Sequence, residues 1–121
     1  MKKKTNYKMG HFAEKVALLY LMVKGYKHIA HNHITGKGTG AGEIDLIMYK
    51  KKTLVFVEVK KRKNKYVAGE AVTLKNQQRT SKAAEVFLKN HPAYQNAAIR
   101  FDVILFGKSL WPHHIKQAWY L

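Results

Sequence analysis

The stretch GEIDLIMYKKKTLVFVEVKKRKN, residues 42–64, contains two apolar runs joined by a short basic segment. The runs Glu43–Tyr49 and Leu54–Lys60 predict two strands, close enough in sequence to form an antiparallel hairpin. The chain has seven acidic residues against 23 basic ones, and three of the seven fall in this hairpin. Acidic residues are poor strand formers, so their presence here needs a physical reason.

Side-chain alternation along the second strand places Glu58 and Lys60 on the same face as Leu54 and Phe56. That face is apolar at one end and ionic at the other. An ordinary exposed sheet face with a cross-strand Glu/Lys pair would account for the charges. An apolar floor that leads to a charged edge is more typical of a cleft.

The register of the hairpin determines which carboxylates face each other. If Tyr49 pairs with Leu54, Asp45 lies opposite Glu58. Their Cβ atoms would then be about 5 Å apart and the two carboxylates would repel each other. A divalent metal ion or a lysine between them would remove the repulsion.

Mg²⁺ suits this arrangement because it takes oxygen ligands, commonly one or two protein carboxylates together with a substrate phosphate. Asp45 and Glu58 are therefore candidate metal ligands. Lys60, which the same register places opposite Glu43, could orient a water molecule or neutralise charge that develops in a transition state. Glu43 is a candidate supporting residue.

Length and composition limit the broad class of the protein. The 121 residues, 46% of them hydrophobic, predict a single domain over 1–121. The chain has no cysteine, which excludes disulfides and thiolate-bound zinc. The longest apolar run, VALLYLMV, is too short to cross a bilayer, so we expect a cytoplasmic protein without a membrane partner.

The formal net charge of +16, from 20 Lys and three Arg against the seven acids, favours a polyanionic partner. A solvated lysine-rich surface is the simpler alternative. On the basis of this charge we expect nucleic acid. The residues expected to contact its phosphates lie in the hairpin turn, after the second strand and on a later helix: Lys50, Lys51, Lys52, Lys61, Arg62, Lys63, Lys65, Lys75, Arg79 and Lys82.

The pattern along the rest of the chain predicts an α/β protein with the order α-β-β-β-α-β. The first helix should end at Gly25, which suits a left-handed stop, and the second should begin at the N-cap Thr73. The remaining predicted elements are a helix over 10–24, a strand over 26–34, a helix over 73–90, a strand over 98–106 and a terminal strand or turn.

Histidines crowd the first predicted strand at His28, His31 and His33. Alternation would place His31 and His33 on one face, and His113 or His114 could complete a zinc site. Structural zinc without cysteine or a clear four-ligand pattern is uncommon. We favour exposed strand histidines near phosphate.

Several segments together resemble the YraN-like family of bacterial proteins, which is related to the PD-(D/E)XK nuclease superfamily of restriction enzymes and Holliday-junction resolvases. The segments, in the order of the family pattern, are AEKVALLYLMVKGY followed by HN, GEIDLI, TLVFVEVKKR, AVTLKNQQRTSKAAEVFL and RFDVILF. They cover most of the chain.

The resemblance implies a restriction-endonuclease-like core, with a central mixed sheet flanked by helices. It implies that Asp45 and Glu58 bind Mg²⁺ or Mn²⁺ and that Lys60 completes the catalytic triad. It also implies that Glu14, on the first helix, binds metal or holds water, and that Gln77, on the second, supports the site.

Three positions deserve a separate interpretation within the resemblance. Ile44 replaces the proline of the superfamily name, which leaves the chemistry of the site unchanged. Asn76 stands where the family pattern has a lysine. Asp102 matches the family segment FDV, and we interpret it as a structural residue that pairs with Arg100 or a nearby lysine.

These features predict a metal-dependent endonuclease that acts on DNA, with any specificity directed at shape, such as a branch or junction. Resolvases of the superfamily act as dimers, so a homodimer remains open. A non-catalytic nucleic-acid-binding module is the main alternative. A basic protein bound to ribosomal or transfer RNA would explain the charge but leave Asp45 and Glu58 unexplained.

Overall fold

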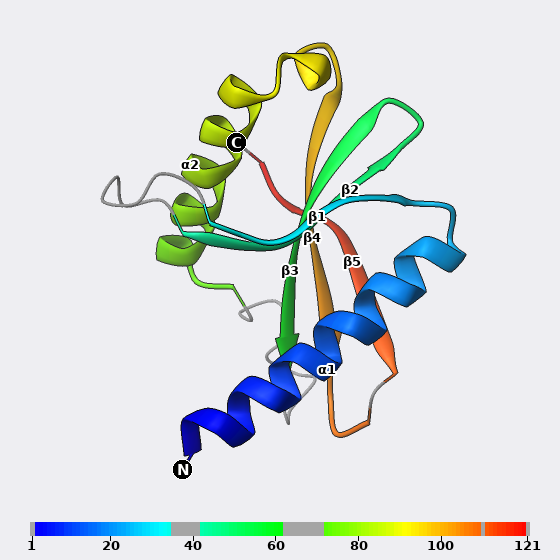
Figure 1. Ribbon diagram of the computed structural model, residues 1–121, viewed down its shortest axis with the longest axis vertical. Helices are drawn as coiled ribbons and strands as arrows, with labels where there is room; N and C mark the ends of the chain where they lie inside the picture. Colours follow the sequence, from blue (N-terminus) through cyan, green and yellow to red (C-terminus); the bar gives the residue numbers. More distant parts are fainter. Residues whose placement is uncertain (1, 35–41, 62–71, 110, 121) are drawn as a thin grey trace.

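The computed structural model describes residues 2–34, 42–61, 72–109 and 111–120, with side chains described from residue 12 onward. Its helices and strands follow one another nearly in the order that the sequence predicts (Figure 1). The elements are α1 (Lys2–Val23), β1 (Lys27–Ile34), β2 (Glu43–Lys50), β3 (Thr53–Lys61), α2 (Leu74–Asn90), the short 3-10 helix η2 (Pro92–Tyr94), β4 (Ala98–Phe106) and β5 (Pro112–Trp119).

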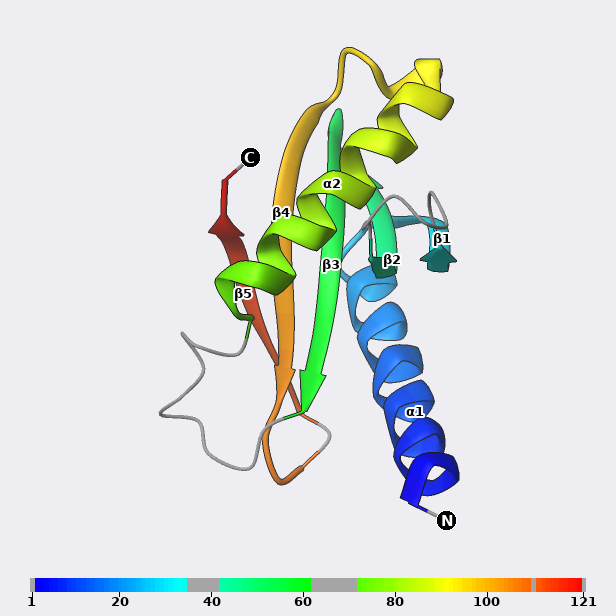
Figure 2. The ribbon, with the colours of Figure 1, turned by 90° about the vertical axis from the view of Figure 1, so that its left-hand side faces the viewer.

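Across the described residues the strands form one sheet in the order β1-β2-β3-β4-β5. Strands β3 and β4 are parallel and the other neighbours are antiparallel. The sheet is therefore mixed, and α2 supplies the crossover between its two parallel strands. Figure 1 shows the helices on opposite sides of the sheet, and Figure 2 shows α2 lying over β3 and β4. The predicted α/β fold is confirmed, and the tail forms a strand.

Strand β3 is buried on both faces, which explains its continuous apolar run. Leu54 and Phe56 pack in the cluster beneath α2, which includes Phe87. Val55 and Val57 pack in the cluster beneath α1. The predicted alternation along this strand is confirmed, and the sheet has one core on each face.

Helix α1 begins at Lys2, eight residues before the predicted start at Gly10. The apolar spacing in the sequence begins only at Ala13, so it did not mark the first turns of the helix. The predicted stop is confirmed: Gly25 has φ +96, and the N–H of Tyr26 donates to Leu21 O at 3.0 Å. This is a Schellman ending, and it places Tyr26 in the core under α1.

Helix α2 begins after Thr73, as predicted. Thr73 has φ −67 and ψ 158, and its Oγ1 accepts a hydrogen bond from the N–H of Asn76 at 3.2 Å. The helix ends at Asn90, two residues before Pro92. The first turn of α2 contributes Asn76 to a cavity that Glu58 and Lys60, near the end of β3, also line.

The hairpin turn is tighter than the predicted four-residue loop. Lys50 pairs with Thr53, so only Lys51 and Lys52 form the turn. Their φ values of 49 and 62 are both positive, as a type I′ turn requires. The predicted pairing of Tyr49 with Leu54 is confirmed.

The prediction that His31 and His33 share a face is wrong. Asn32 between them has φ 48, which breaks the strand alternation. His31 stacks on His28 with ring centroids 5.1 Å apart and lines a cavity beside α1, whereas His33 packs edge-on against Phe87 of α2. The two histidines therefore cannot act as neighbouring ligands on one face.

No helix in the described part of the chain is long and apolar enough to span a membrane.

Candidate active site

The candidate site lies where β2 and β3 separate. Their ladder runs from the Lys50–Thr53 pair to Leu46 and Val57, and stops there. Beyond that point β2 continues to pair with β1 as far as Glu43, and β3 continues to pair with β4 as far as Lys61. Figure 1 shows the start of β2 leaving the direction of β3. The divergence begins at Asp45 and Glu58.

Asp45 and Glu58 were predicted to lie opposite each other in the hairpin, but they are not a pair of the β2–β3 ladder. The two residues come one step after its last pair, in the opening between the strands. Asp45 Oδ2 accepts a hydrogen bond from the N–H of Val59 at 2.8 Å. The carboxylate thus takes the place that a backbone carbonyl would occupy if the ladder continued.

The environment of Asp45 opposes its negative charge. Burial, followed by repulsion from Glu58, raises its pKa to about 8, and Glu14 adds to the rise. The hydrogen bond from Val59 and the charge of Lys60 lower the pKa but do not compensate. A cation beside Asp45 would stabilise its ionised form.

Glu58 and Lys60 form an ion pair, with Nζ 3.0 Å from Oε1 and side chains 12% and 21% exposed. Both side chains line a cavity of about 150 Å³ between the sheet and α2, which confirms that they share a face. The cavity is lined by Gly42, Glu43, Glu58, Lys60, Asn76, Arg79 and Thr80.

Helix α2 contributes Asn76 and Arg79 to this cavity, not Gln77. The Gln77 amide donates to Val72 O at 3.1 Å, and its side chain lines a different cavity together with Trp119. The sequence could have identified Asn76, because residues four apart lie on one face of a helix. Counting back in steps of four from the buried Ala84 gives Thr80 and Asn76. Asn76 thus faces the site from the position where the family pattern has a lysine.

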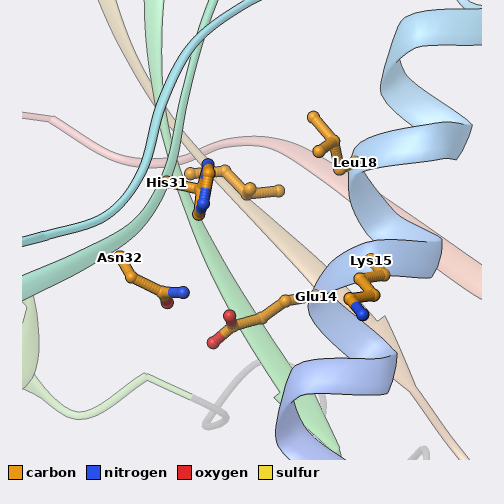
Figure 3. Close-up of a pocket in the computed structure, with 6 residues that line it drawn as sticks. Glu14, Lys15, Leu18, His31 and Asn32 are labelled. Atoms are coloured by element: carbon orange, nitrogen blue, oxygen red, sulfur yellow. The ribbon is translucent and has the colours of Figure 1, made fainter.

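Asn32 links two of the carboxylates and was missed as a site residue. When its amide is turned so that the nitrogen faces them, it donates to Glu14 Oε2 at 2.8 Å and to Glu43 Oε1 at 3.3 Å. Figure 3 shows the Asn32 amide and the Glu14 carboxylate pointing toward each other. Two features of the sequence could have pointed to Asn32. Asparagine is among the few residue types that adopt a positive φ readily, and the dipeptide HN belongs to the family pattern.

Helix α1 brings Glu14 toward the hairpin carboxylates, as the resemblance implies. Glu14 lines a cavity of about 250 Å³ between α1 and β1, with Leu18, His31 and Asn32 among its walls (Figure 3). Its charge contributes to the raised pKa of Asp45. Four of the seven acids of the chain, Glu14, Glu43, Asp45 and Glu58, therefore gather around the divergence.

Asp102 lies elsewhere, fully buried on β4. Arg100 Nε and Nη2 donate to its two oxygens, both at 2.8 Å, and His114 Nε2 lies 2.7 Å from Oδ2. The predicted structural pairing with Arg100 is confirmed. Burial alone would raise the pKa of Asp102, but the hydrogen bonds from His114, Arg100 and the Gln117 N–H hold it below its ordinary value.

The predicted phosphate-contacting residues are only partly within the described structure. Lys51, Lys52, Lys61, Lys75, Arg79 and Lys82 are exposed. Lys50 is half-buried, and its Nζ donates to Lys24 O at 2.6 Å. Arg62, Lys63 and Lys65 lie outside the described residues.

The donor chemistry fits Mg²⁺ or Mn²⁺ because Asp45 and Glu58 supply two neighbouring carboxylates, and burial and like charges disfavour the ionised form of Asp45. Within the described residues, no group of three or more His, Cys, Asp or Glu side chains is arranged so that it could hold a metal ion. Mg²⁺ usually needs only one or two carboxylates, with water and substrate phosphate as further ligands. Asp45 and Glu58 are the pair that could serve.

The described part of the chain, a mixed sheet flanked by two helices, is compatible with a restriction-endonuclease-like core. The family model of the uncharacterised protein family UPF0102 matches residues 13–106, and the chain belongs to this family. The predicted YraN-like family is thereby confirmed. The matched range includes Glu14, Asn32 and every described residue of the candidate site.

Curated relatives of the same family match over most of their length. A UPF0102 protein of Paramagnetospirillum magneticum is 39% identical over 91% of this chain and 85% of its own. One of Parvibaculum lavamentivorans is 38% identical over 93% and 82%. One of Nitrobacter winogradskyi is 39% identical over 88% and 86%.

Proposed function

We propose that this protein is a metal-dependent endonuclease that hydrolyses phosphodiester bonds of DNA. One observation supports the proposal: at the point where β2 and β3 separate, Asp45 is close enough to Glu58 for their charges to repel, and Glu58 and Lys60, 3.0 Å apart, line a cavity. Two neighbouring carboxylates, one of which lines a cavity together with a lysine, suit metal-assisted attack on a phosphate.

The fold favours this chemistry because it holds the Asp45 carboxylate in surroundings that disfavour its negative charge. The Val59 N–H fixes Asp45 in the gap between the strands. The neighbouring carboxylates disfavour its ionised form, so a divalent cation gains binding energy by neutralising them. A structural carboxylate would be expected to have donors instead of like charges as its neighbours.

A bound divalent cation would polarise the phosphate and help to generate a nucleophile from water at neutral pH. Glu58 orients Lys60, which places a positive charge where negative charge develops on the phosphate oxygens. Arg79 and Asn76 face the same cavity from α2 and would contact the substrate from the other wall. Asn32, Glu14 and Glu43 form a hydrogen-bonded group that could hold a water molecule.

The net charge of +16 supports nucleic acid as the substrate, because neutralising phosphates releases counterions and drives binding. Phosphate contacts carry no base information. We therefore propose recognition of shape, with branched or four-way-junction DNA as the first candidates and a homodimer as the assembly to look for.

The test is cleavage of labelled duplex, single-stranded, flap and four-way-junction DNA, with matched RNA, in Mg²⁺, Mn²⁺ or EDTA. Glu58→Gln and Lys60→Gln should each reduce metal-dependent cleavage by about 100-fold or more. Glu85→Gln and Lys89→Gln change the same charges at exposed positions of α2 and should cleave like the wild type. Equal activity in all four variants would contradict the assignment of the site.

A non-catalytic nucleic-acid-binding module is the second candidate. The ion pair between Lys60 and Glu58 favours it, because each group already neutralises the other without a metal ion. Tight, salt-sensitive binding of the same substrates without cleavage in any metal would support this function and exclude the endonuclease.

A further inference from the structure

A second cavity, of about 260 Å³, lies at the opposite end of the β2–β3 hairpin from the candidate active site. Its lining consists of basic and hydroxyl-bearing side chains, and we name it the basic cavity. It is formed by Tyr26, Lys50, Lys51, Thr53, Arg100 and Lys116.

Arg100 supplies a guanidinium group that is held rigidly in this cavity. Its Nε and Nη2 donate to Asp102, and Nη2 also donates to the Tyr26 hydroxyl at 2.6 Å. No hydrogen bond within the described residues uses Nη1. Planar guanidinium donors fixed in this way are well suited to the oxygens of phosphate.

Lys50 is also fixed at the wall of the cavity. Its Nζ donates to Lys24 O at 2.6 Å and lies 4.8 Å from the centroid of the Tyr26 ring. Two cations therefore share one aromatic ring, since Arg100 Cζ is 5.7 Å from the same centroid. Both cations also line the cavity, so an anion bound in it would reduce the repulsion between them.

The charges around the cavity do not balance. Lys50, Lys51, Arg100 and Lys116 contribute four cations. The carboxylate in contact with this set is Asp102, which is fully buried and also bound by His114. The cavity mouth is therefore strongly positive, with hydroxyl donors from Tyr26 and Thr53.

The hairpin turn provides independent support. Lys51 and Lys52 both have positive φ, at a type of turn in which Asn-Gly, Asp-Gly or Gly-Gly is strongly preferred. Non-glycine residues in this conformation carry strain, and such strain concentrates at functional sites. The chain thus keeps lysines where other residues would fold more favourably.

We propose that the basic cavity binds a phosphate group, and that the source of this phosphate is the backbone of the nucleic acid whose cleavage is proposed above. Only this assignment of the source rests on the proposed function. Lys50 is five residues along β2 from Asp45, which corresponds to about 17 Å. A backbone bound at both points would extend over about five base pairs at a rise of 3.4 Å.

Phosphate binding itself is tested by NMR titration of the metal-free protein with inorganic phosphate. Shifts should concentrate on the Thr53 amide and the Arg100 Nε–H. The double variant Lys51→Gln, Lys116→Gln should raise the Kd for phosphate by about fivefold. The control Lys89→Gln, Lys108→Gln has the same net charge and should bind as the wild type. Chemical-shift changes spread over the whole surface, or phosphate binding weakened equally in both double variants, would overturn the assignment of a phosphate site to the basic cavity.

A second variant separates binding from folding. Lys51→Asn, Lys52→Gly gives the turn its preferred residues and should raise Tm by about 5 °C. It should nevertheless bind duplex DNA more weakly, with the slope of log Kobs against log salt concentration reduced by about 1 to 2. A more stable protein with unchanged DNA binding would overturn the assignment of a backbone phosphate.

The DNA measurements use Glu58→Gln as the background, so that cleavage does not interfere. Failure of the endonuclease proposal would leave the phosphate titration unaffected. If inorganic phosphate binds in the basic cavity but DNA does not compete with it, the backbone assignment is wrong and the cavity takes a free phosphate.

Discussion

Asp45 and Asp102 are both strand aspartates withdrawn from solvent, yet their surroundings are opposite. Asp102 accepts from Arg100, His114 and a backbone N–H, and its pKa lies below the ordinary value. Asp45 accepts from one backbone N–H, faces other carboxylates, and has a pKa raised to about 8. A carboxylate surrounded by donors stabilises the fold. One surrounded by like charges is available to bind a cation.

The largest expected effect is on stability at Asp102. Asp102→Asn would leave the half-buried guanidinium of Arg100 without its counter-charge and should lower the free energy of unfolding by about 3 kcal/mol. Urea denaturation of wild type and variant measures the difference. A loss below about 1 kcal/mol would show that the network contributes little to the fold.

The matching substitution at Asp45 should affect activity and leave stability intact. Asp45→Asn removes repulsion with Glu58, so the free energy of unfolding should stay the same or rise, while metal-dependent cleavage falls by about 100-fold or more. Parallel cleavage assays and urea titrations in EDTA check both parts. A large loss of stability would place Asp45 in the same structural class as Asp102.

The lowered pKa of Asp102 predicts an acid dependence of stability. Because its folded pKa lies below the unfolded value, its contribution is present above the unfolded pKa of about 3.9 and is lost as the pH falls through the folded pKa. The stability gap between wild type and Asp102→Asn should therefore be constant near neutral pH and shrink below about pH 4. A gap that widened on acidification would have the wrong sign.

The smallest effect is expected at Asn32. Asn32→Gly tolerates the positive φ but removes the amide that bridges Glu14 and Glu43. Cleavage should fall by about tenfold while stability changes by less than about 1 kcal/mol. Asn32→Ala is the comparison variant, because it removes the same amide and adds backbone strain. Unchanged cleavage in the glycine variant would mean that the bridge has no role in the site.

Local patterns were sufficient for most of the fold. The Thr73 cap, the Gly25 stop and the pairing of Tyr49 with Leu54 were all predictable, because each depends on residues close together in the chain. Strand alternation correctly placed Glu58 and Lys60 on one face. The extension of α1 to Lys2 was missed because the sequence over 2–9, KKKTNYKM, lacks apolar residues at helical spacing.

In the candidate site, too, some features follow from the sequence and others only from the tertiary structure. The sequence by itself determined which carboxylates and which lysine lie in the hairpin, and the family pattern added Glu14. Only the tertiary structure decided that β2 and β3 separate at Asp45, because each strand keeps a different neighbour there. The same is true of the Asn32 bridge, and of the basic cavity, where Tyr26, Arg100 and Lys116 meet the hairpin from distant parts of the chain. Such contacts depend on packing between elements, which no local periodicity encodes.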